Sequence, residues 1–454
     1  MNKKTILALL SGLTLFTACT DFLTGGELST DPNRPTQATN QQLFVGIQAA
    51  TWALLTSDLP RVTGLWVQQF KGGNIQYEAA YDYDVSEQTT NGFHQSLYLG
   101  GGLVDIRKLE QQALASDDSV FLGQAQVMEA LVMGTGASLF GDLTYTHALT
   151  NELAPPLDEQ LDIYDSVQVV LSAAIENLSR TGPTNSGAGD ADLAYGGDPE
   201  QWIKLAHTLK ARFLMHTAEV RPGVYGEVLS EANQGLQTLD DNFNAVFSGN
   251  ANEQNFWYQF VVVQRPGYLL PDPQFVNLLE SRNDPRLTGY FLEDPKNPGE
   301  FIDLADSLVQ ANHTQPLVTA NENLLLAAEA AYRTGEPGTA LTRLNEARAL
   351  AGLPAESGVS GLTLLNEILT EAYIADYQNI EAWNLYKRTC TPNLTPTNPS
   401  AAITAGKIPA RFPYDAAERN TNTNIPPLGS QPKRNDNDPA NATSDGTGAA
   451  CKGQ

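Results

Sequence analysis

Apolar residues recur every three or four positions along most of this chain, which is the spacing of one face of an α-helix. The pattern predicts helices over residues 42–57, 93–115, 120–140, 163–178, 199–220, 224–239, 321–332, 338–351 and 362–388. Some have start signals, such as Asp118 before the third and Asp198 with Pro199 at the fifth. Strand-like runs are few, chiefly residues 258–263. The sequence therefore predicts a mostly α protein with long irregular loop insertions.

One predicted helix pair is specific enough to compare with a known motif. In residues 321–351, Ala328, Ala340 and Ala347 are small and Leu344 is large. This spacing matches a tetratricopeptide helical hairpin, in which small residues let two antiparallel helices approach closely. The other predicted helices show no repeat of about 34 residues. We therefore expect tetratricopeptide-like helical hairpins wrapped by insertions rather than a regular solenoid.

The N-terminus has the layout of an export signal. Two lysines precede an apolar run over residues 6–16, and two small residues come before Cys19. A cationic start, a short apolar core and small residues at the cut are typical of a secretory signal peptide. The run is too short for a permanent membrane helix, which needs about twenty apolar residues. We therefore expect residues 1–18 to be a signal peptide and the rest of the chain to be exported.

Cys19 stands where a lipid would be attached. The residues before it resemble a bacterial lipobox, with Phe16 in place of the usual Leu. The resemblance implies a lipoprotein-type signal that is cut before Cys19, which then carries several acyl chains and anchors the protein firmly. Residues 19–40 would form a lipidated tether, and residues 41–454 a single domain. An ordinary secreted protein with a chance cysteine is the alternative.

The composition limits the partners of the exported chain. The full sequence has 52 acidic residues against 27 lysines and arginines, and without Lys3 and Lys4 of the signal peptide the exported chain carries 25 − 52 = −27. Such an acidic surface repels phosphates and argues against nucleic acid as a ligand. If Cys19 carries lipid, Cys390 and Cys451 are the remaining cysteines, and export permits a disulfide between them. Two free thiols are the alternative.

Two stretches combine aromatic side chains with polar ones. The first spans residues 66–83, where two glycines open a loop, and the second spans residues 256–268 in a Pro/Gly-rich region. Aromatic rings can meet the C–H faces of sugars, and a mostly apolar cleft with a few placed polar groups is the usual small-ligand site. We therefore predict a ligand-binding set of Asn74, Tyr77, Tyr81, Tyr83, Trp257, Tyr258 and Tyr268.

A packing role is the alternative for these aromatic residues. Trp66 lies in an amphipathic run and is predicted to be buried, as are Trp202 and Trp383. Tyrosines are stable when half buried with a wet hydroxyl, so the three of the first stretch fit either role. One face of the segment around Trp257 is also expected to be core.

No pattern selects a catalytic or metal site. The five histidines form no HExxH motif, and nothing singles out the two carboxylates that a glycoside hydrolase would need. Gly134 and Gly136 lie inside a helical pattern, where close helix packing explains them better than a phosphate loop. Residues 240–244 offer oxygen ligands but lack the glycine and final glutamate of a calcium loop. We predict no catalytic residue, metal or cofactor.

Short motifs along nearly the whole exported chain carry a family resemblance. They are residues 21–23, 30–35, 129–131, 140–145, 202–212, 284–287, the hairpin above, 383–388 and 411–414 with Glu418 and Asn420. Thr144 and Asp415 depart from the pattern, since proline is usual at both places. In this order the motifs resemble those of SusD/RagB-like outer-membrane nutrient-binding lipoproteins.

The resemblance implies a SusD-like fold and a non-enzymatic role in nutrient uptake. Such a protein would lie on the outer membrane, facing the cell exterior and held by its lipid. It would bind an oligosaccharide or a peptide, with glycan favoured, and deliver it to a SusC-type TonB-dependent transporter. A lipid-anchored surface hydrolase and a tetratricopeptide-like outer-membrane assembly or scaffold protein are the alternatives.

Overall fold

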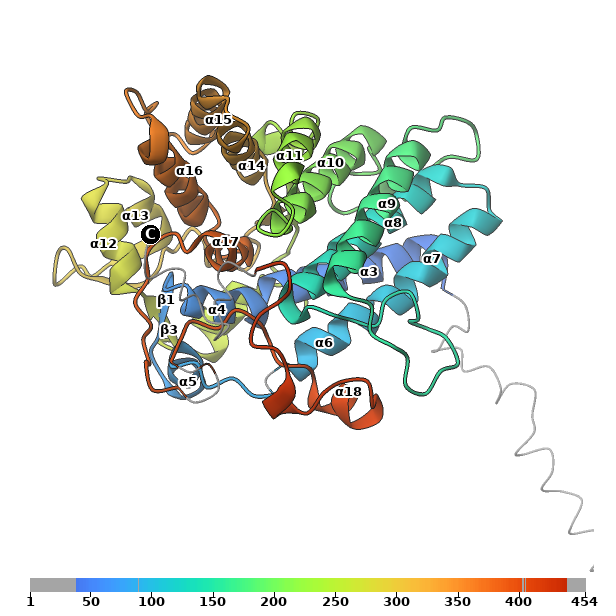
Figure 1. Ribbon diagram of the computed structural model, residues 1–454, viewed down its shortest axis with the longest axis horizontal. Helices are drawn as coiled ribbons and strands as arrows, with labels where there is room; N and C mark the ends of the chain where they lie inside the picture. The colour runs from blue at the N-terminus through green and yellow to red at the C-terminus, as the bar shows by residue number, and fades with distance from the viewer. Residues whose placement is uncertain (1–37, 89, 402–403, 405, 439–454) are drawn as a thin grey trace, which may run out of the picture.

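The structure is a computed structural model that describes residues 38–438 except 89, 402–403 and 405 (Figure 1). The predicted signal peptide, Cys19, Cys451 and most of the predicted tether lie outside the described residues. The first described helix begins with a capping box. The Thr39 hydroxyl accepts a hydrogen bond from the Gln42 backbone N–H (3.2 Å), and the Gln42 side chain accepts one from the Thr39 N–H (3.0 Å).

Helices dominate the described chain, as predicted. In chain order they are α3 (Asn40–Thr56), α4 (Asp58–Trp66), α5 (Ile75–Tyr81), α6 (Asn91–Tyr98), α7 (Leu103–Ala115), α8 (Ser119–Phe140), α9 (Gln160–Leu178), α10 (Pro199–His216), α11 (Tyr225–Ala232), α12 (Pro273–Ser281), α13 (Arg286–Tyr290), α14 (Ala320–Arg333), α15 (Pro337–Leu350), α16 (Gly361–Ala375), α17 (Glu381–Thr389) and α18 (Ala416–Thr421). The segment η4 (Tyr258–Gln264) is a π-helix.

The long helices form a row in which each packs on the next. Helix α7 contacts α8, α8 contacts α9, α9 contacts α10, α10 contacts α11, α11 contacts α14, and α14 contacts both α15 and α16. Figure 1 shows this row from α7 on the right to α15 and α16 on the left. Each helix covers the apolar stripe of its neighbour. The helices therefore lie in the row in the same order as they occur along the chain.

Helix α8 is buried along almost its whole length. Asp118 caps its start by accepting a hydrogen bond from the Phe121 N–H (2.9 Å). A Cβ atom on Gly134 would lie 2.4 Å from the ring of Phe213 in α10. One on Gly136 would lie 2.8 Å from side-chain atoms of Leu97 and Leu143. Close helix packing is thus confirmed as the reason for these glycines.

Helices α14 and α15 form the predicted hairpin. Ala328, Ala340 and Ala347 are fully buried at its interface, and Leu344 packs with them in one apolar cluster. Pro337 lies in the first turn of α15. Proline is tolerated there because a backbone N–H at this position would have no acceptor within the helix. The two predicted helices are therefore confirmed, and the row around them is consistent with tetratricopeptide-like packing.

Four predicted helices and one predicted strand are wrong in detail. The span 93–115 is broken into α6 and α7, because Gly100 and Gly101 have φ angles of 64° and 106° that end a helix. The span 362–388 is broken into α16 and α17 near Gln378, which has a φ of 63°. Helices α10 and α11 are shorter than predicted. Residues 258–263 are not a strand but most of η4.

Within residues 38–438, six short strands lie in the insertions and pair into three antiparallel ladders. They are β1 (Phe70–Gly72) with β3 (Leu269–Pro271), β2 (Phe243–Ala245) with β6 (Gln315–Val318), and β4 (Phe291–Glu293) with β5 (Phe301–Leu304). Each ladder joins segments that are distant in the sequence or separated by a loop. The ladders therefore fix the course of the insertions against the helical row.

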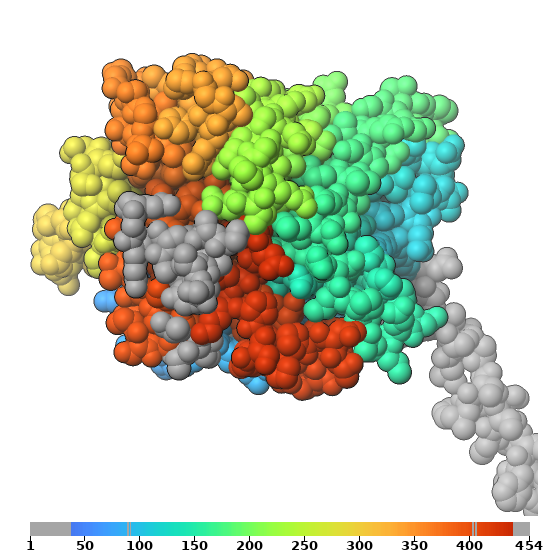
Figure 2. All heavy atoms as spheres, in the orientation of Figure 1, coloured from blue at the N-terminus to red at the C-terminus, as the bar shows by residue number. Residues whose placement is uncertain are grey.

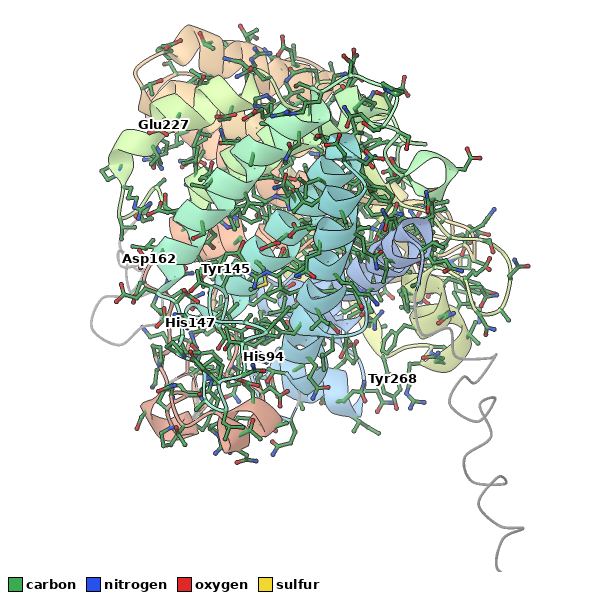
Figure 3. The ribbon with its side chains drawn as sticks, turned by 90° about the vertical axis from the view of Figure 1, so that its right-hand side faces the viewer. His94, Tyr145, His147, Asp162, Glu227 and Tyr268 are labelled. Atoms are coloured by element: carbon green, nitrogen blue, oxygen red, sulfur yellow. The ribbon has the colours of Figure 1, made fainter. Side chains whose placement is uncertain are left out.

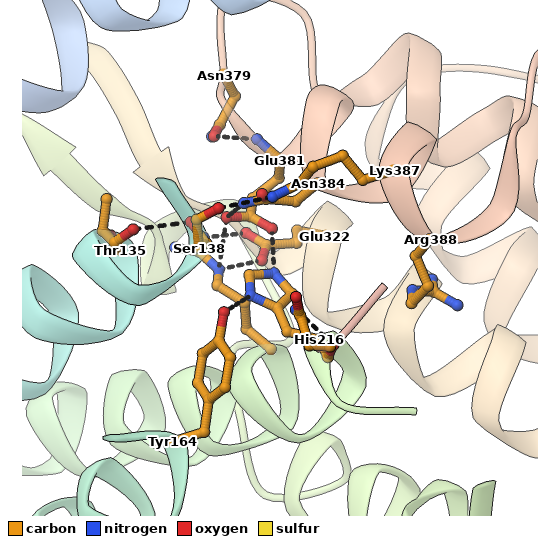
Figure 4. A network of polar contacts seen from close by, with 12 residues as sticks. Thr135, Ser138, Tyr164, His216, Glu322, Asn379, Glu381, Asn384, Lys387 and Arg388 are labelled. Atoms are coloured by element: carbon orange, nitrogen blue, oxygen red, sulfur yellow. Dashed lines mark hydrogen bonds and ion pairs between the residues drawn. The ribbon is translucent and has the colours of Figure 1, made fainter. Parts of the chain in front are cut away.

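A buried polar network joins α9, α10, α14 and α17 (Figure 4). Arg212 donates two hydrogen bonds to Glu322, both 2.6 Å long. His216 bridges the Tyr164 hydroxyl (3.3 Å) and Glu381 (2.8 Å). Burial alone would raise the pKa of Glu381, but His216 and Arg212 beside it lower that pKa to about 2. A second buried pair joins Arg388 and Glu329 at 2.7 and 2.6 Å.

The C-terminal part packs back onto the end of α8. The Phe412 N–H donates to the Leu139 carbonyl (2.9 Å), and the Tyr414 hydroxyl donates to that of Asp142 (2.7 Å). Figure 2 shows this part, in red, across the lower centre of one face. Cys390 is disulfide-bonded, and its pairing with Cys451 stays a prediction. Among the residues described, no helix is at once long enough and apolar enough to cross a lipid bilayer.

Candidate ligand-binding groove

The β1–β3 ladder brings the two predicted aromatic stretches together. Phe70 pairs with Pro271 and Gly72 with Leu269, and the Gly73 N–H donates to the Tyr268 carbonyl (2.9 Å). A Cβ atom on Gly72 would lie 2.1 Å from the Tyr77 carbonyl oxygen, and one on Gly73 would lie 2.2 Å from that of Gly267. The two glycines therefore let the backbones approach closely.

A buried arginine joins these stretches from inside. The guanidinium carbon of Arg61 in α4 lies 4.3 Å from the ring centroid of Phe260 and 5.8 Å from that of Trp257. Its Nε donates to the Tyr77 hydroxyl (2.8 Å), and that hydroxyl donates to Asp58. Arg61 thus links α4, α5 and η4 through one side chain.

A second polar pair lies nearby, between α5 and the start of α12. The Tyr81 hydroxyl donates to Asp272 Oδ2 (2.7 Å), and Oδ1 of the same carboxylate accepts from the Gln274 N–H (2.7 Å) as the cap of α12. Burial raises the pKa of Asp272 to about 6, although both hydrogen bonds lower it. The pair holds the loop after α5 against the segment after β3.

The π-helix η4 has one buried face and one open face. Its start is set by Asn255, whose side-chain oxygen accepts from the backbone N–H groups of Trp257 (2.8 Å) and Tyr258 (3.2 Å). Trp257, Phe260 and Val261 are buried. Gln259, Val263 and Gln264 of η4, with Phe256 just before it, line an open groove of about 960 Å³. π-Turns of this kind are frequent at functional sites.

Three aromatic rings give the groove its apolar floor. Trp52 comes from α3, Phe247 from the segment after β2, and Phe256 from the residue pair before η4. The ring centroids of Phe247 and Phe256 are 5.9 Å apart in an edge-to-face contact, and those of Trp52 and Phe247 are 6.3 Å apart. The indole nitrogen of Trp52 is buried and has no hydrogen-bond partner in the described structure.

The polar lining consists mainly of primary amides. Gln259 and Gln254 make long contacts with backbone carbonyls, of 3.4 and 3.5 Å. Glu253 accepts hydrogen bonds from Ser248 (2.5 Å) and Asn250 (2.9 Å). The amide lining residues are Asn252, Gln254, Gln259 and Gln264. We call this pocket, with the three rings above and the aliphatic residues Val45, Ala49, Leu193, Val246 and Val263, the aromatic-amide groove.

The comparisons with known proteins point to one family. A SusD-like family model, described as "Starch-binding associating with outer membrane", matches residues 32–415. This chain belongs to the SusD-like family. The comparison with curated proteins found no match.

Solved structures of SusD-like proteins share the fold of this one. A SusD/RagB family protein from Bacteroides thetaiotaomicron has 21% identity and a TM-score of 0.67, covering 86% of this chain and 95% of its own. A chitin-binding SusD homolog from Flavobacterium johnsoniae has 18% identity and a TM-score of 0.71, covering 87% and 97%. A SusD homolog from Bacteroides uniformis has 22% identity and a TM-score of 0.68, covering 84% and 95%. The SusD-like fold predicted from the motifs is confirmed.

Three of the seven predicted ligand residues of this SusD-like protein are core residues. Tyr77 is 2% exposed, Tyr83 is 1% exposed and Trp257 is fully buried. The Tyr77 ring packs on Phe260 with centroids 4.8 Å apart, and the Trp257 ring packs on Phe70 at 5.4 Å. Their prediction as ligand contacts is corrected, because their rings pack in the core and leave no exposed face for a ligand. Trp66, Trp202 and Trp383 are buried, as predicted.

The other four predicted residues keep some exposed surface. Asn74 is exposed at the start of α5, while Tyr81, Tyr258 and Tyr268 are half-buried. Figure 3 shows Tyr268 well apart from Tyr145 and His147. None of the seven predicted residues lines the aromatic-amide groove. A ligand-binding role for these four stays a prediction.

The groove residues escaped the sequence prediction because they come from distant segments. Trp52 and Phe256, the outermost of the three ring residues, are 204 positions apart (256 − 52), and only Phe256 lies inside a predicted stretch. The available signal was local: residues 250–264 contain three asparagines and three glutamines around an aromatic run. No group of three His, Cys, Asp or Glu side chains in the described part of the chain is placed to hold a metal ion.

Proposed function

We propose that this SusD-like protein binds an oligosaccharide in the aromatic-amide groove and acts by capture rather than by bond cleavage. The observation that carries this is the groove itself, in which three aromatic rings lie beside four primary amides. Rings contact the C–H faces of sugars, and amides offer a donor and an acceptor to hydroxyl groups. The chitin-binding homolog with the same fold supports a glycan over a peptide.

Capture on a membrane surface follows from the same proposal. Lipid on Cys19 would anchor the protein to the outer membrane on the exterior side, with residues 19–40 as tether and residues 41–454 as the capture domain. The family description, which names association with the outer membrane, supports this location. A SusC-type TonB-dependent transporter would receive the ligand.

Two neighbouring valines on η4 give a matched test of the groove. Val263 lines the groove and is 58% exposed, whereas Val262 is 45% exposed and does not line it. An arginine at position 263 would place a long charged side chain in the groove, so V263R should weaken binding of maltohexaose or chitohexaose by at least about tenfold in calorimetry. V262R adds the same charge next door and should leave the affinity unchanged. Equal effects of the two variants would contradict the groove as the binding site.

Three further measurements test the rest of the proposal. Incubation with these oligosaccharides should release no new reducing ends, and their release would favour the hydrolase alternative. Cys19→Ser should move the protein from the membrane to the soluble fraction, and continued membrane retention would contradict lipid anchoring. A mild-detergent pull-down of the lipidated protein should recover a large β-barrel, while recovery with assembly machinery would favour the scaffold alternative.

A further inference from the structure

The charge of the aromatic-amide groove excludes one large class of glycans. Glu253 is the single charged side chain among the lining residues, and no lysine, arginine or histidine of the described chain lines the groove. Two arginines lie next to the lining without being part of it. Arg61 donates to the Phe256 carbonyl (3.3 Å) and also to Asp58 and Tyr77, and Arg265 donates to the Gln264 carbonyl (3.4 Å). The chain as a whole carries a formal charge of −25. A polyanionic saccharide would meet Glu253 and no cation within the lining, and the field of the whole chain would repel it.

The amides of the groove are available to a ligand. Within the described structure, the side chains of Asn252 and Gln264 make no hydrogen bond, and those of Gln254 and Gln259 make only the long contacts given above. A primary amide presents one acceptor and two donor hydrogens in a plane. That pattern complements a secondary amide, whose N–H and C=O need one acceptor and one donor.

The apolar wall is larger than a hydroxyl-rich ring needs. Val45, Leu193, Val246 and Val263 all line the groove while keeping substantial exposure to solvent. Exposed aliphatic surface that gathers around a concave site gains most from a ligand that brings its own apolar group. A methyl group next to an amide is such a group, and hydroxyl groups offer none.

We infer that the groove selects uncharged saccharides that carry acetamido groups. The amide lining would pair with the acetamido N–H and C=O, the aliphatic wall would cover the methyl group, and the rings would contact the sugar faces. This inference rests on the proposed function, because it assigns a ligand class to the groove proposed above.

The experiment compares two hexasaccharides that differ in one substituent with a third that is polyanionic. Chitohexaose and cellohexaose share a β-1,4-linked backbone and differ only in the acetamido group at each ring, and hexagalacturonate supplies a polyanion. Calorimetry on the purified protein should give an affinity for chitohexaose at least about tenfold above that for cellohexaose. Hexagalacturonate should give no measurable heat of binding. V263R should abolish the preference, while V262R should keep it.

The outcomes separate this inference from the proposed function. Equal affinities for chitohexaose and cellohexaose, both lost in V263R, would overturn the acetamido inference and leave glycan capture in the groove standing. Tight binding of hexagalacturonate would overturn the charge argument. Chitohexaose binding that V263R leaves intact would overturn the assignment of this preference to the groove. No binding of any of the three would overturn the proposed function and this inference together.

Discussion

Removing the hydroxyl of Tyr77 tests whether this tyrosine is a ligand contact or a structural linker. In the structure, the hydroxyl accepts from Arg61 and donates to Asp58, and the ring is buried against Phe260. Tyr77→Phe keeps the ring and deletes only the polar link. Tyr77→Ala deletes both, so the two variants divide the packing contribution from the hydrogen-bond contribution.

The expected magnitudes follow from burial. In Tyr77→Phe the Nε–H of buried Arg61 loses its acceptor, and an unsatisfied buried donor lowers the free energy of unfolding by about 1–3 kcal/mol. In Tyr77→Ala a buried aromatic ring is also lost, for which about 3–5 kcal/mol is typical. Urea unfolding followed by tryptophan fluorescence measures both changes. Tyr268→Phe is the control. The half-buried Tyr268 ring packs edge-to-face on the same Phe260 ring, with centroids 6.4 Å apart, and no hydrogen bond of its hydroxyl is found in the described structure.

Ligand affinity then decides between the two roles. Measured well below the unfolding transition, Tyr77→Phe should bind chitohexaose or maltohexaose with the affinity of the unaltered protein, because the ring never reaches the ligand. A loss of affinity of about tenfold or more in Tyr77→Phe, with no change in the free energy of unfolding, would refute the burial argument and restore Tyr77 as a ligand contact.

Three other substitutions probe the framework of the site. Gly72→Ala should destabilise the protein strongly, because its Cβ would lie 2.1 Å from a carbonyl oxygen, whereas Gly249→Ala, with open space around it, should be neutral by thermal melting. Burial raises the pKa of Asp272 to about 6 from 3.8, so between about pH 4 and pH 6 the folded state binds a proton that the unfolded state has lost. The free energy of unfolding should therefore fall by about 3 kcal/mol as the pH rises through this range. Asp272→Asn should remove that fall, which urea unfolding at pH 4 and pH 7 would measure. Arg388→Met should cost about 3 kcal/mol by leaving Glu329 buried without its main partner, and adding Glu329→Leu should restore most of the loss in a double-mutant cycle.

The helical row could be predicted because its signals are local. Each signal depends only on the neighbouring turn of helix. Examples are Asp118 at the start of α8, Pro337 at the start of α15 and the small alanines of the hairpin. The break at Gly100 and Gly101 was missed because apolar spacing continues on both sides of it. The breaks at Gly100, Gly101 and Gln378 lie at positive φ angles, which a periodicity of apolar residues does not encode.

The site was harder to predict because the same aromatic residues occur in hydrophobic cores and in ligand-binding clefts. Tyr77 and Trp257 have the composition of a sugar site, yet the β1–β3 ladder turns them inward. Of the half-buried tyrosines, Tyr81 keeps its hydroxyl bonded to Asp272. Which side of a segment faces solvent depends on long-range pairing, and Trp52 and Phe247 meet only after the chain has folded.

The π-helix η4 places core contacts and groove contacts of this chain in one short segment. A π-turn holds one residue more than an α-turn, and Tyr258–Gln264 is such a segment. Phe260 packs in the core, whereas Gln259, Val263 and Gln264 line the groove. Deleting one lining residue such as Val263 would therefore let a π-turn become an α-turn, which changes the groove lining while the core contact of Phe260 is kept. Single-residue deletions in η4 are thus a simple way to alter the ligand preference of this protein with its helical row unchanged.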